Sequence, residues 1–184
     1  MLNKIYLQLI VQPIQLKLMK KTYGRVAAFA LTAMLGLPAL AVEVGQPAPD
    51  FDLPGGKGAV KLSDYKGKVV YVDFWASWCG PCKQSFPWMN DMQTRYGGKG
   101  LNLVAVNVDQ KPEDAKTFLN DNAAKFTVAF DQGGKTPKAY AIKGMPTSVL
   151  IGADGKVLMV HNGFKDEQRG ELEKQIKQAL NLKD

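Results

Sequence analysis

The chain has 184 residues, of which 46% are hydrophobic and 22% are charged. This composition is ordinary for a globular protein, and the length allows one domain with a proper hydrophobic core. The formal net charge of +7 suggests nucleic-acid binding, but residues 1–41 hold five basic side chains and no acidic one, whereas residues 42–184 hold 19 basic and 17 acidic side chains. The nearly neutral body lacks the basic surface that phosphate backbones select, which argues against a nucleic-acid partner.

The first 41 residues have the order of features of an export signal. Lys20-Lys21 precede an apolar run over residues 26–40, which closes with the small-x-small sequence Ala39-Leu40-Ala41. The run is about 15 residues long and contains a glycine and a proline, so it is shorter than the roughly 20 residues of a bilayer span. We expect cleavage after Ala41 and a mature protein in the periplasm, with retention as an uncleaved inner-membrane anchor as the alternative.

Met19 stands directly before the two lysines, where a compact signal peptide would start. The preceding residues are either an over-extended start or part of an unusually long leader. In both cases residues 1–41 are predicted to lie outside the fold, and residues 42–184 to form the domain.

Beyond residue 41, strands and helices are predicted to alternate. An extended segment over 45–53 leads to a turn at Pro54-Gly55-Gly56. The expected strands are apolar, β-branched runs, and they cover residues 59–62, 68–75, 101–108, 126–130, 148–151 and 156–160. The expected helices cover residues 63–65 (a single turn), 79–96, 112–124, 136–141 and 166–180. This order predicts an α/β domain with a mixed central sheet covered by helices on both faces.

The chain contains two cysteines, Cys79 and Cys82, with two residues between them. A disulfide that closes so small a loop removes little entropy from the unfolded chain, so a purely structural role explains it poorly. Zinc needs four ligands, and beyond these thiols the chain offers one histidine, His161, about eighty residues away. The pattern therefore predicts a redox-active disulfide Cys79–Cys82, with no metal and no other cofactor.

The predicted fold places Cys79 at the start of a helix, directly after a buried strand. Unpaired N–H groups and the positive end of the helix dipole stabilise an anion there, so Cys79 is predicted to be the nucleophilic thiolate. Cys82 lies one helical turn further on the same face, where it can resolve a mixed disulfide and is expected to be less exposed. Pro81 is compatible with the first turn, where its missing N–H removes no hydrogen bond.

Two stretches of the chain resemble the thioredoxin superfamily. Val72-Asp73-Phe74-Trp75-Ala76-Ser77-Trp78-Cys79-Gly80-Pro81-Cys82-Lys83 matches the signature around the active-site cysteines. Lys143-Gly144-Met145-Pro146-Thr147 matches the loop with a cis-proline that faces the cysteines and pairs with the substrate backbone. The resemblance covers about residues 44–182.

Among the branches of that superfamily, the chain looks most like the exported TlpA/ResA-type reductases. The stretch Val44-Gly45-Gln46-Pro47-Ala48-Pro49-Asp50-Phe51 resembles their start. An extra helix–strand insertion between Asp109 and Pro146, before the cis-proline loop, is absent from small thioredoxins. The export signal agrees with this branch.

The resemblance assigns roles to particular residues. Asp73 stands where thioredoxins keep a buried acid that moves protons for the resolving thiol, and burial should raise the pKa of such a carboxyl. The partner lysine of thioredoxin is replaced by Ala105, which leaves the proton route open. The expected catalytic residues are Cys79, Cys82 and Asp73, and the expected substrate-binding residues are Trp78, Gly80, Pro81, Met145 and a cis Pro146.

The resulting hypothesis is a monomeric periplasmic reductase of protein disulfides, recharged by a membrane thiol–disulfide transporter. Its substrates would be oxidised periplasmic proteins, in cytochrome c maturation or a similar reducing pathway. No glutamate follows Pro146-Thr147, so the loop signature of the cytochrome c maturation reductases is incomplete.

Two other functions fit the sequence less well. A thiol peroxidase would need a threonine or serine three residues before its cysteine, where this chain has Ala76. A Cu(I)-handling, chaperone-like protein could use two thiolates as soft ligands, but no Met/His cluster accompanies them.

Trp88 and Met89 are predicted to be core residues, and His161 to be exposed in a turn.

Overall fold

The computed structural model describes residues 42–183; the predicted export signal lies outside the described residues. The described part contains one seven-stranded mixed sheet. Its strands are β1 (Asp52–Gly55), β2 (Gly58–Lys61), β3 (Val69–Trp75), β4 (Leu101–Asn107), β5 (Thr127–Phe130), β6 (Thr147–Ile151) and β7 (Val157–Asn162). Its helices are α2 (Gly80–Tyr96), α3 (Pro112–Asp121), α4 (Lys135–Ala139) and α5 (Arg169–Ala179), with 3-10 turns η1 (Leu62–Tyr65), η2 (Gly97–Lys99) and η3 (Asp166–Gln168).

The strand order across the sheet is β2-β1-β5-β4-β3-β6-β7. Strands β3, β4 and β5 run parallel to one another, whereas β6, β7 and the β1–β2 hairpin are antiparallel to their neighbours. All seven residues of β3 are buried, as expected for an apolar run at the centre of a sheet that is covered on both faces.

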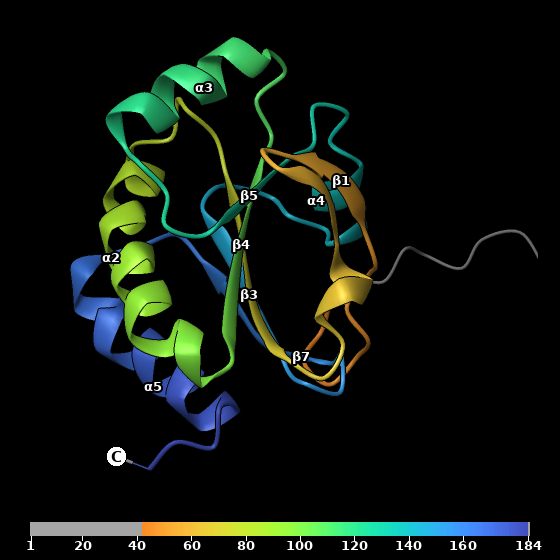
Figure 1. Ribbon diagram of the computed structural model, residues 1–184, viewed down its shortest axis with the longest axis vertical. Helices are drawn as coiled ribbons and strands as arrows, with labels where there is room; N and C mark the ends of the chain where they lie inside the picture. The colour runs from red at the N-terminus through yellow and green to blue at the C-terminus, as the bar shows by residue number, and fades with distance from the viewer. Residues whose placement is uncertain (1–41, 184) are drawn as a thin grey trace, which may run out of the picture. The chain divides into compact units, whose positions relative to one another are not determined.

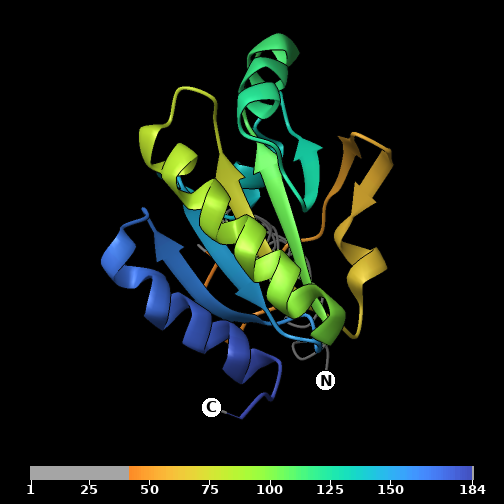
Figure 2. The same ribbon diagram turned by 60° about the vertical axis from the view of Figure 1, so that its left-hand side comes forward.

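Helices cover both faces of the sheet, which confirms the predicted fold class. Figure 1 shows α2 and α5 on one side of the strands and α4 on the other, and Figure 2 shows α2 lying across the strands. Alternate residues of β3 point to opposite faces. Tyr71 and Trp75 therefore join the core under α2, α3 and α5, whereas Val72 and Phe74 join the core around α4 and the β1–β2 hairpin.

An aromatic cluster joins the inserted α3–β5 unit to the helix that begins after Cys79. The ring of Phe86 on α2 lies 4.9 Å from Trp75, 5.0 Å from Phe118 and 5.3 Å from Phe126, measured between ring centroids. Edge-to-face arrangements of this kind add to the stabilisation that burial alone provides. The insertion predicted from the sequence is therefore packed into the same core as β3 and α2.

The turn predicted at Pro54-Gly55-Gly56 is partly wrong. Pro54 and Gly55 belong to β1, where they pair with Ala59 and Gly58, and the turn consists of Gly56 and Lys57. A two-residue connection is the commonest hairpin loop. Position 55 favours glycine, because a Cβ atom there would lie 2.9 Å from the carbonyl oxygen of Gly58, which is too close.

The helix predicted over 112–124 ends earlier, at Asp121. Asn122 donates from both its backbone N and its Nδ2 to the carbonyl oxygen of Phe118, each at 2.9 Å. Asparagine competes with the backbone in this way and so favours helix ends. His161, predicted in a turn, lies instead in β7, because the pairing of β7 with β6 continues to Asn162.

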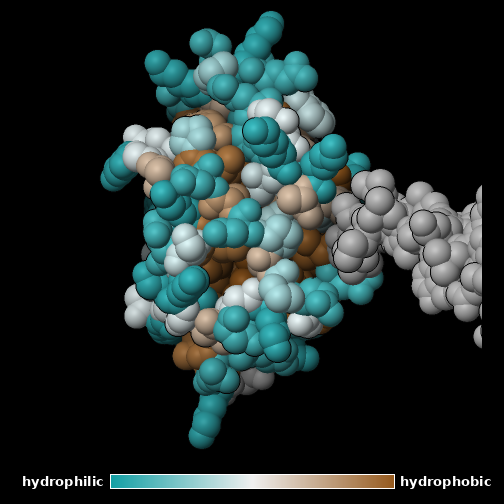
Figure 3. All heavy atoms as spheres, turned by 90° about the vertical axis from the view of Figure 1, so that its right-hand side faces the viewer, coloured by the Kyte–Doolittle hydropathy of each residue, from teal (hydrophilic) through white to brown (hydrophobic). Residues whose placement is uncertain are grey.

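Polar side chains dominate the face that carries the β1–β2 hairpin, and apolar atoms show between them only in patches (Figure 3). Within residues 42–183, none of the helices combines the length and the hydropathy required to span a bilayer.

Truncation of Phe86 tests the aromatic cluster. We expect F86A to lower the free energy of unfolding by about 3–5 kcal/mol, because a nearly fully buried ring is lost and a cavity remains. Urea denaturation of the oxidised protein measures this change. The matched control is L158A, since Leu158 is 40% exposed; a loss as large in the control as in F86A would contradict the assigned role of the cluster.

Candidate active site

The loop between β3 and α2 brings Cys79 to the first turn of α2. Cys79 is the N-cap residue in an extended conformation, and its Sγ accepts a hydrogen bond of 3.2 Å from the backbone N–H of Cys82. Its own N–H donates to the carbonyl oxygen of Ala76 at 3.1 Å. A sulfur in this position receives an N–H that would otherwise be unpaired, at the positive end of the helix dipole, and both effects favour negative charge on it.

Cys79 and Cys82 form a disulfide with a Cα–Cα distance of 5.2 Å. Cys79 is 4% exposed and Cys82 is fully buried, in the order predicted for an attacking and a resolving sulfur. The two residues between them, Gly80 and Pro81, are exposed on the first turn of α2, so the rim of the disulfide is open to an incoming partner.

The second predicted motif lies beside the first because β6 is antiparallel to β3. Thr147 pairs with Phe74, so the residues before Thr147 continue toward the loop that carries Cys79. The Met145–Pro146 peptide bond is cis, as expected. Pro146 is buried, and the half-buried Met145 packs against the core cluster that contains both cysteines.

An open groove adjoins the disulfide on the side of α3. It has a volume of about 420 Å³, and Trp78 at its edge is 73% exposed. Its lining combines the start of α2 with one face of α3, namely Ser77, Trp78, Cys79, Gly80, Lys83, Asp114, Thr117, Phe118, Asp121 and Asn122. An exposed aromatic side chain next to a reactive sulfur suits contact with a partner chain.

Asp73 lies in β3 on the face that is covered by α2 and α5, and it is 1% exposed. Its Oδ1 accepts a hydrogen bond of 2.7 Å from the hydroxyl of Ser148 on β6, and its Oδ2 has no hydrogen-bond partner among the described residues. Burial raises the pKa of the carboxyl to about 7, and the Ser148 hydrogen bond partly offsets this rise. The register places Ala105 opposite Asp73, so β4 supplies no lysine there.

Sequence reasoning missed a buried clamp on the loop before the disulfide. The carboxylate of Asp109 accepts hydrogen bonds from the backbone N and the hydroxyl of Ser77, both at 3.0 Å at their shortest, and from Asn107 Nδ2 at 2.8 Å. Asp109 follows the carboxyl end of β4, next to the carboxyl end of β3. A polar residue at the ends of two adjacent parallel strands was the signal that could have found it.

The remaining predicted positions are packed into the fold. Trp75, Trp88 and Met89 are buried, the last two as expected. Thr147 donates to the carbonyl oxygen of Gly144 at 2.7 Å, which holds the proline loop. His161 is half-buried, and its Nε2 lies 3.3 Å from Gln168 Oε1.

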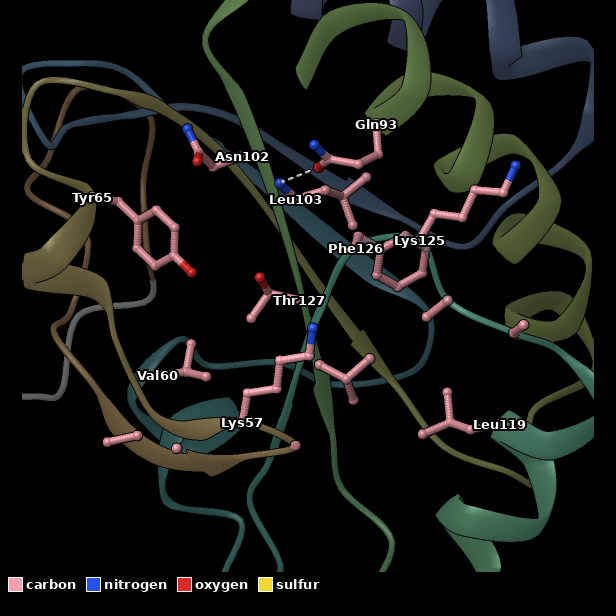
Figure 4. Close-up of a pocket in the computed structure, with 16 residues that line it drawn as sticks. Lys57, Val60, Tyr65, Gln93, Asn102, Leu103, Leu119, Lys125, Phe126 and Thr127 are labelled. Carbon is pink, nitrogen blue, oxygen red and sulfur yellow. Dashed lines mark hydrogen bonds between the residues drawn. The ribbon is translucent and has the colours of Figure 1, made fainter. Parts of the chain in front are cut away.

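A wider hollow, of about 800 Å³, lies away from the cysteines. It forms because β1 meets β5 at a single pair, Gly55 with Ala129, so the hairpin diverges from the sheet. Figure 4 shows Lys57 and Tyr65 on the hairpin side, facing Gln93, whose Oε1 accepts the N–H of Leu103 at 3.0 Å. None of the predicted site residues lines this hollow.

Within residues 42–183, no three His, Cys, Asp or Glu side chains are grouped as metal ligands.

Comparison with known proteins agrees with this geometry. The Redoxin family model matches residues 43–180. Thiol-disulfide oxidoreductase ResA of Bacillus thuringiensis is 38% identical over 139 residues, which cover 74% of this chain and 78% of the relative. ResA of Bacillus subtilis is 35% identical over 127 residues, which cover 68% and 71% of the two chains.

A crystal structure from Chlorobium tepidum, of a protein described as a candidate thiol:disulfide interchange protein DsbE, is 58% identical to this chain. It superimposes with a TM-score of 0.75 and covers 76% of this chain and 99% of that one. Taken with the disulfide at the start of α2 and the adjoining cis-proline loop, these likenesses show that the chain belongs to the Redoxin family, within the thioredoxin superfamily, as a TlpA/ResA-like thiol–disulfide oxidoreductase.

Proposed function

We propose that this oxidoreductase reduces disulfides of exported proteins in the periplasm. The exchange chemistry is supported by the contrast between two groups: the sulfur of Cys79 accepts an N–H at the start of α2, whereas burial raises the pKa of the Asp73 carboxyl to about 7. The first arrangement favours an attacking thiolate, and the second supplies a proton acceptor near neutral pH. The reducing direction is supported by Gly80-Pro81 between the cysteines together with Asp73, a combination that resembles the reducing members of the superfamily.

The reaction begins from the reduced protein. The Cys79 thiolate attacks one sulfur of a substrate disulfide, a Cys79–substrate bond forms, and the second substrate sulfur leaves as a thiolate that takes up a proton. Asp73 then removes the proton of the Cys82 thiol, directly or through an intervening group. The Cys82 thiolate attacks the Cys79 sulfur, the bond between Cys79 and the substrate breaks, and the first substrate sulfur leaves as a thiolate. That sulfur takes up a proton, and Asp73 gives up the proton it had accepted. Two electrons have passed to the substrate, and the Cys79–Cys82 disulfide has formed.

A partner chain would dock on the open rim of this disulfide. Trp78, Gly80 and Pro81 are exposed there, while Met145 and Pro146 directly precede β6, which pairs with β3. The groove of about 420 Å³ beside Cys79 extends this surface along α3. We infer that Trp78 and Met145 contact the partner, and that its backbone pairs with the segment around Pro146.

The cellular setting is part of the proposal, and features of the sequence support it. Lys20-Lys21 and the apolar run that ends in Ala39-Leu40-Ala41 support export. Outside the cytoplasm no soluble thioredoxin system supplies electrons, so a membrane thiol–disulfide transporter would reduce Cys79–Cys82 after each turnover. Maturation of cytochrome c, or a similar pathway that needs reduced cysteines, would use the product.

Substitution of each cysteine tests their division of labour. We expect C79S to abolish the reduction of insulin disulfides, since the attacking sulfur is lost. C82S should still attack and should accumulate mixed disulfides, because the resolving sulfur is lost; mass spectrometry of trapped species measures this. Trapping by C79S in place of C82S would reverse the assignment.

The reduction potential tests the direction of electron flow. We expect the Cys79–Cys82 couple, equilibrated with glutathione or dithiothreitol, to lie nearer to the value of thioredoxin, about −270 mV, than to that of DsbA, about −120 mV. A value near that of DsbA would identify an oxidant and contradict the proposal.

Replacement of Asp73 by asparagine tests the buried acid. Since the folded carboxyl has a pKa of about 7 and the reference value is 3.8, the folded protein holds a proton that the unfolded chain has lost between these values. The contribution of Asp73 to stability therefore falls as the pH rises from about 4 to about 7, and does not change further above that value. D73N is neutral at every pH, so urea unfolding of the oxidised protein should show it to be more stable than the wild type at pH 8.

The difference in stability between D73N and the wild type should close as the pH falls toward 4. Resolution of mixed disulfides by D73N should be about 100-fold slower than in the wild type, as expected when a general base is removed. Equal rates for the two proteins across the pH range would remove Asp73 from the mechanism.

A further inference from the structure

Asp73 has one hydrogen-bond partner within the described part of the chain, and that partner is on a different strand. Ser148 lies directly opposite Asp73 in the β3–β6 register, and its hydroxyl is 2.7 Å from Oδ1. Both side chains are buried, at 1% and 3% exposed. The lysine expected as a partner in thioredoxins is absent, since β4 presents Ala105 at this level of the sheet.

We propose that Ser148 is the positioning residue of the buried acid: its hydroxyl fixes the orientation of the Asp73 carboxyl and sets the pH at which that carboxyl exchanges its proton. The proposal deepens the proposed function and rests on it, since Asp73 acts there as the proton acceptor. Ser148 touches neither the disulfide nor a substrate in this role; it acts through Asp73.

The hydrogen-bond geometry specifies how Ser148 acts on each protonation state of Asp73. A hydroxyl has one proton to donate, and the Ser148 hydroxyl lies within bonding distance of Oδ1. When Asp73 is protonated, its proton therefore belongs on Oδ2, the oxygen without another partner among residues 42–183. When Asp73 is ionised, the same hydrogen bond is charge-assisted and stabilises the anion, which counteracts the effect of burial.

Ser148 also connects Asp73 to the cis-proline loop. It is two residues after Pro146 on β6, and the hydroxyl of the residue between them, Thr147, lies 2.7 Å from the carbonyl oxygen of Gly144 and 3.1 Å from Asn162 Oδ1. A partner that pairs with the segment around Pro146 would thus bind next to the strand that holds the Asp73 carboxyl. Ser148, which donates to Asp73, and the proposed docking segment around Pro146 therefore belong to one short stretch of backbone.

The elements around Asp73 offer few other groups that could control it. Across Ser148, on β7, stands His161, which is turned toward Gln168 of η3. On the same strand stands Tyr71, whose pKa is raised far above the usual range by burial and by the neighbouring Asp73, with a smaller opposite effect of Ser148. The core on this face of the sheet includes Tyr71 and Trp75 of β3, Leu103 and Ala105 of β4, Cys82, Phe86 and Met89 of α2, Leu172 and Ile176 of α5, and Cys79.

Titration of the Asp73 carboxyl carbon in the oxidised protein tests the proposal, because disulfide-bonded cysteines do not titrate and cannot be coupled to it. The experiment uses aspartate labelled with ¹³C, and the missing signal of D73N identifies the resonance. We expect S148A to move the titration upward by about one pH unit, a tenfold smaller ionised fraction below the midpoint, since one charge-assisted hydrogen bond is lost. S148T, which keeps the hydroxyl, should restore the wild-type midpoint.

Y140F is the matched control. The hydroxyl of Tyr140 donates a hydrogen bond of the same length, 2.7 Å, to the carbonyl oxygen of Pro49, and its ring packs in the core on the other face of the sheet. This variant also loses a buried hydroxyl, but the Asp73 midpoint should not move. An unmoved midpoint in S148A, or an equal shift in Y140F, would overturn the proposal.

Kinetics separates this proposal from the proposed function. The pH profile for resolution of a mixed disulfide between Cys79 and a model peptide should move upward in S148A and return in S148T. A shifted NMR midpoint with an unmoved kinetic profile would overturn the role of Ser148 in the reaction, while disulfide reduction would stand. Failure of the wild type to reduce any disulfide would instead overturn the proposed function, and the titration would still decide whether Ser148 controls Asp73.

Discussion

Complete burial of β3 is the constraint on which the site depends. All seven of its residues are covered, so the strand is fixed at the centre of the sheet and its carboxyl end is held in one place. The chain leaves the sheet there and starts α2 after Cys79. Because β4 is parallel to β3 and β6 is antiparallel, the end of β4 and the beginning of β6 meet the same edge. Asp109 and Pro146 are brought to the cysteine loop by this arrangement.

Burial disfavours the charged form of both the sulfur and the carboxyl, and the two groups differ in what offsets this effect. Cys79 is close to the surface at a helix start, where the N–H of Cys82 offsets the loss of solvation for an anion. Asp73 lies deeper, with one hydroxyl as its donor, and burial therefore dominates and raises its pKa. The surroundings of Cys79 therefore favour negative charge, whereas those of Asp73 favour the protonated carboxyl. A dithiol reductase needs an attacking sulfur that is charged and a proton acceptor for its resolving sulfur.

Local patterns in the sequence were sufficient for much of this structure, and contacts between distant residues were not. The apolar run around Asp73 predicted a central strand, and the motif around Pro146 predicted the cis bond. The hydrogen bonds of Ser148 to Asp73 and of Asp109 to Ser77 join residues 75 and 32 positions apart. They depend on strand order and register, which a single sequence does not specify. Asn122 ended α3 early through a side-chain bond that helical periodicity does not detect.

Packing of the insertion separates the chemistry from the surface that a partner meets. Phe86, Phe118 and Phe126 fix α3 and β5 against α2, so the outer wall of the groove is rigidly placed relative to Cys79. The exposed side chains on that wall, such as Asp114 and Asp121, form no ion pair with another described residue. They can therefore change the fit of a partner without disturbing the hydrogen bonds that set the charge of the sulfur and the carboxyl. In the proposed mechanism, reactivity depends on β3, β6 and the start of α2, and α3 contributes to the surface that a partner would contact.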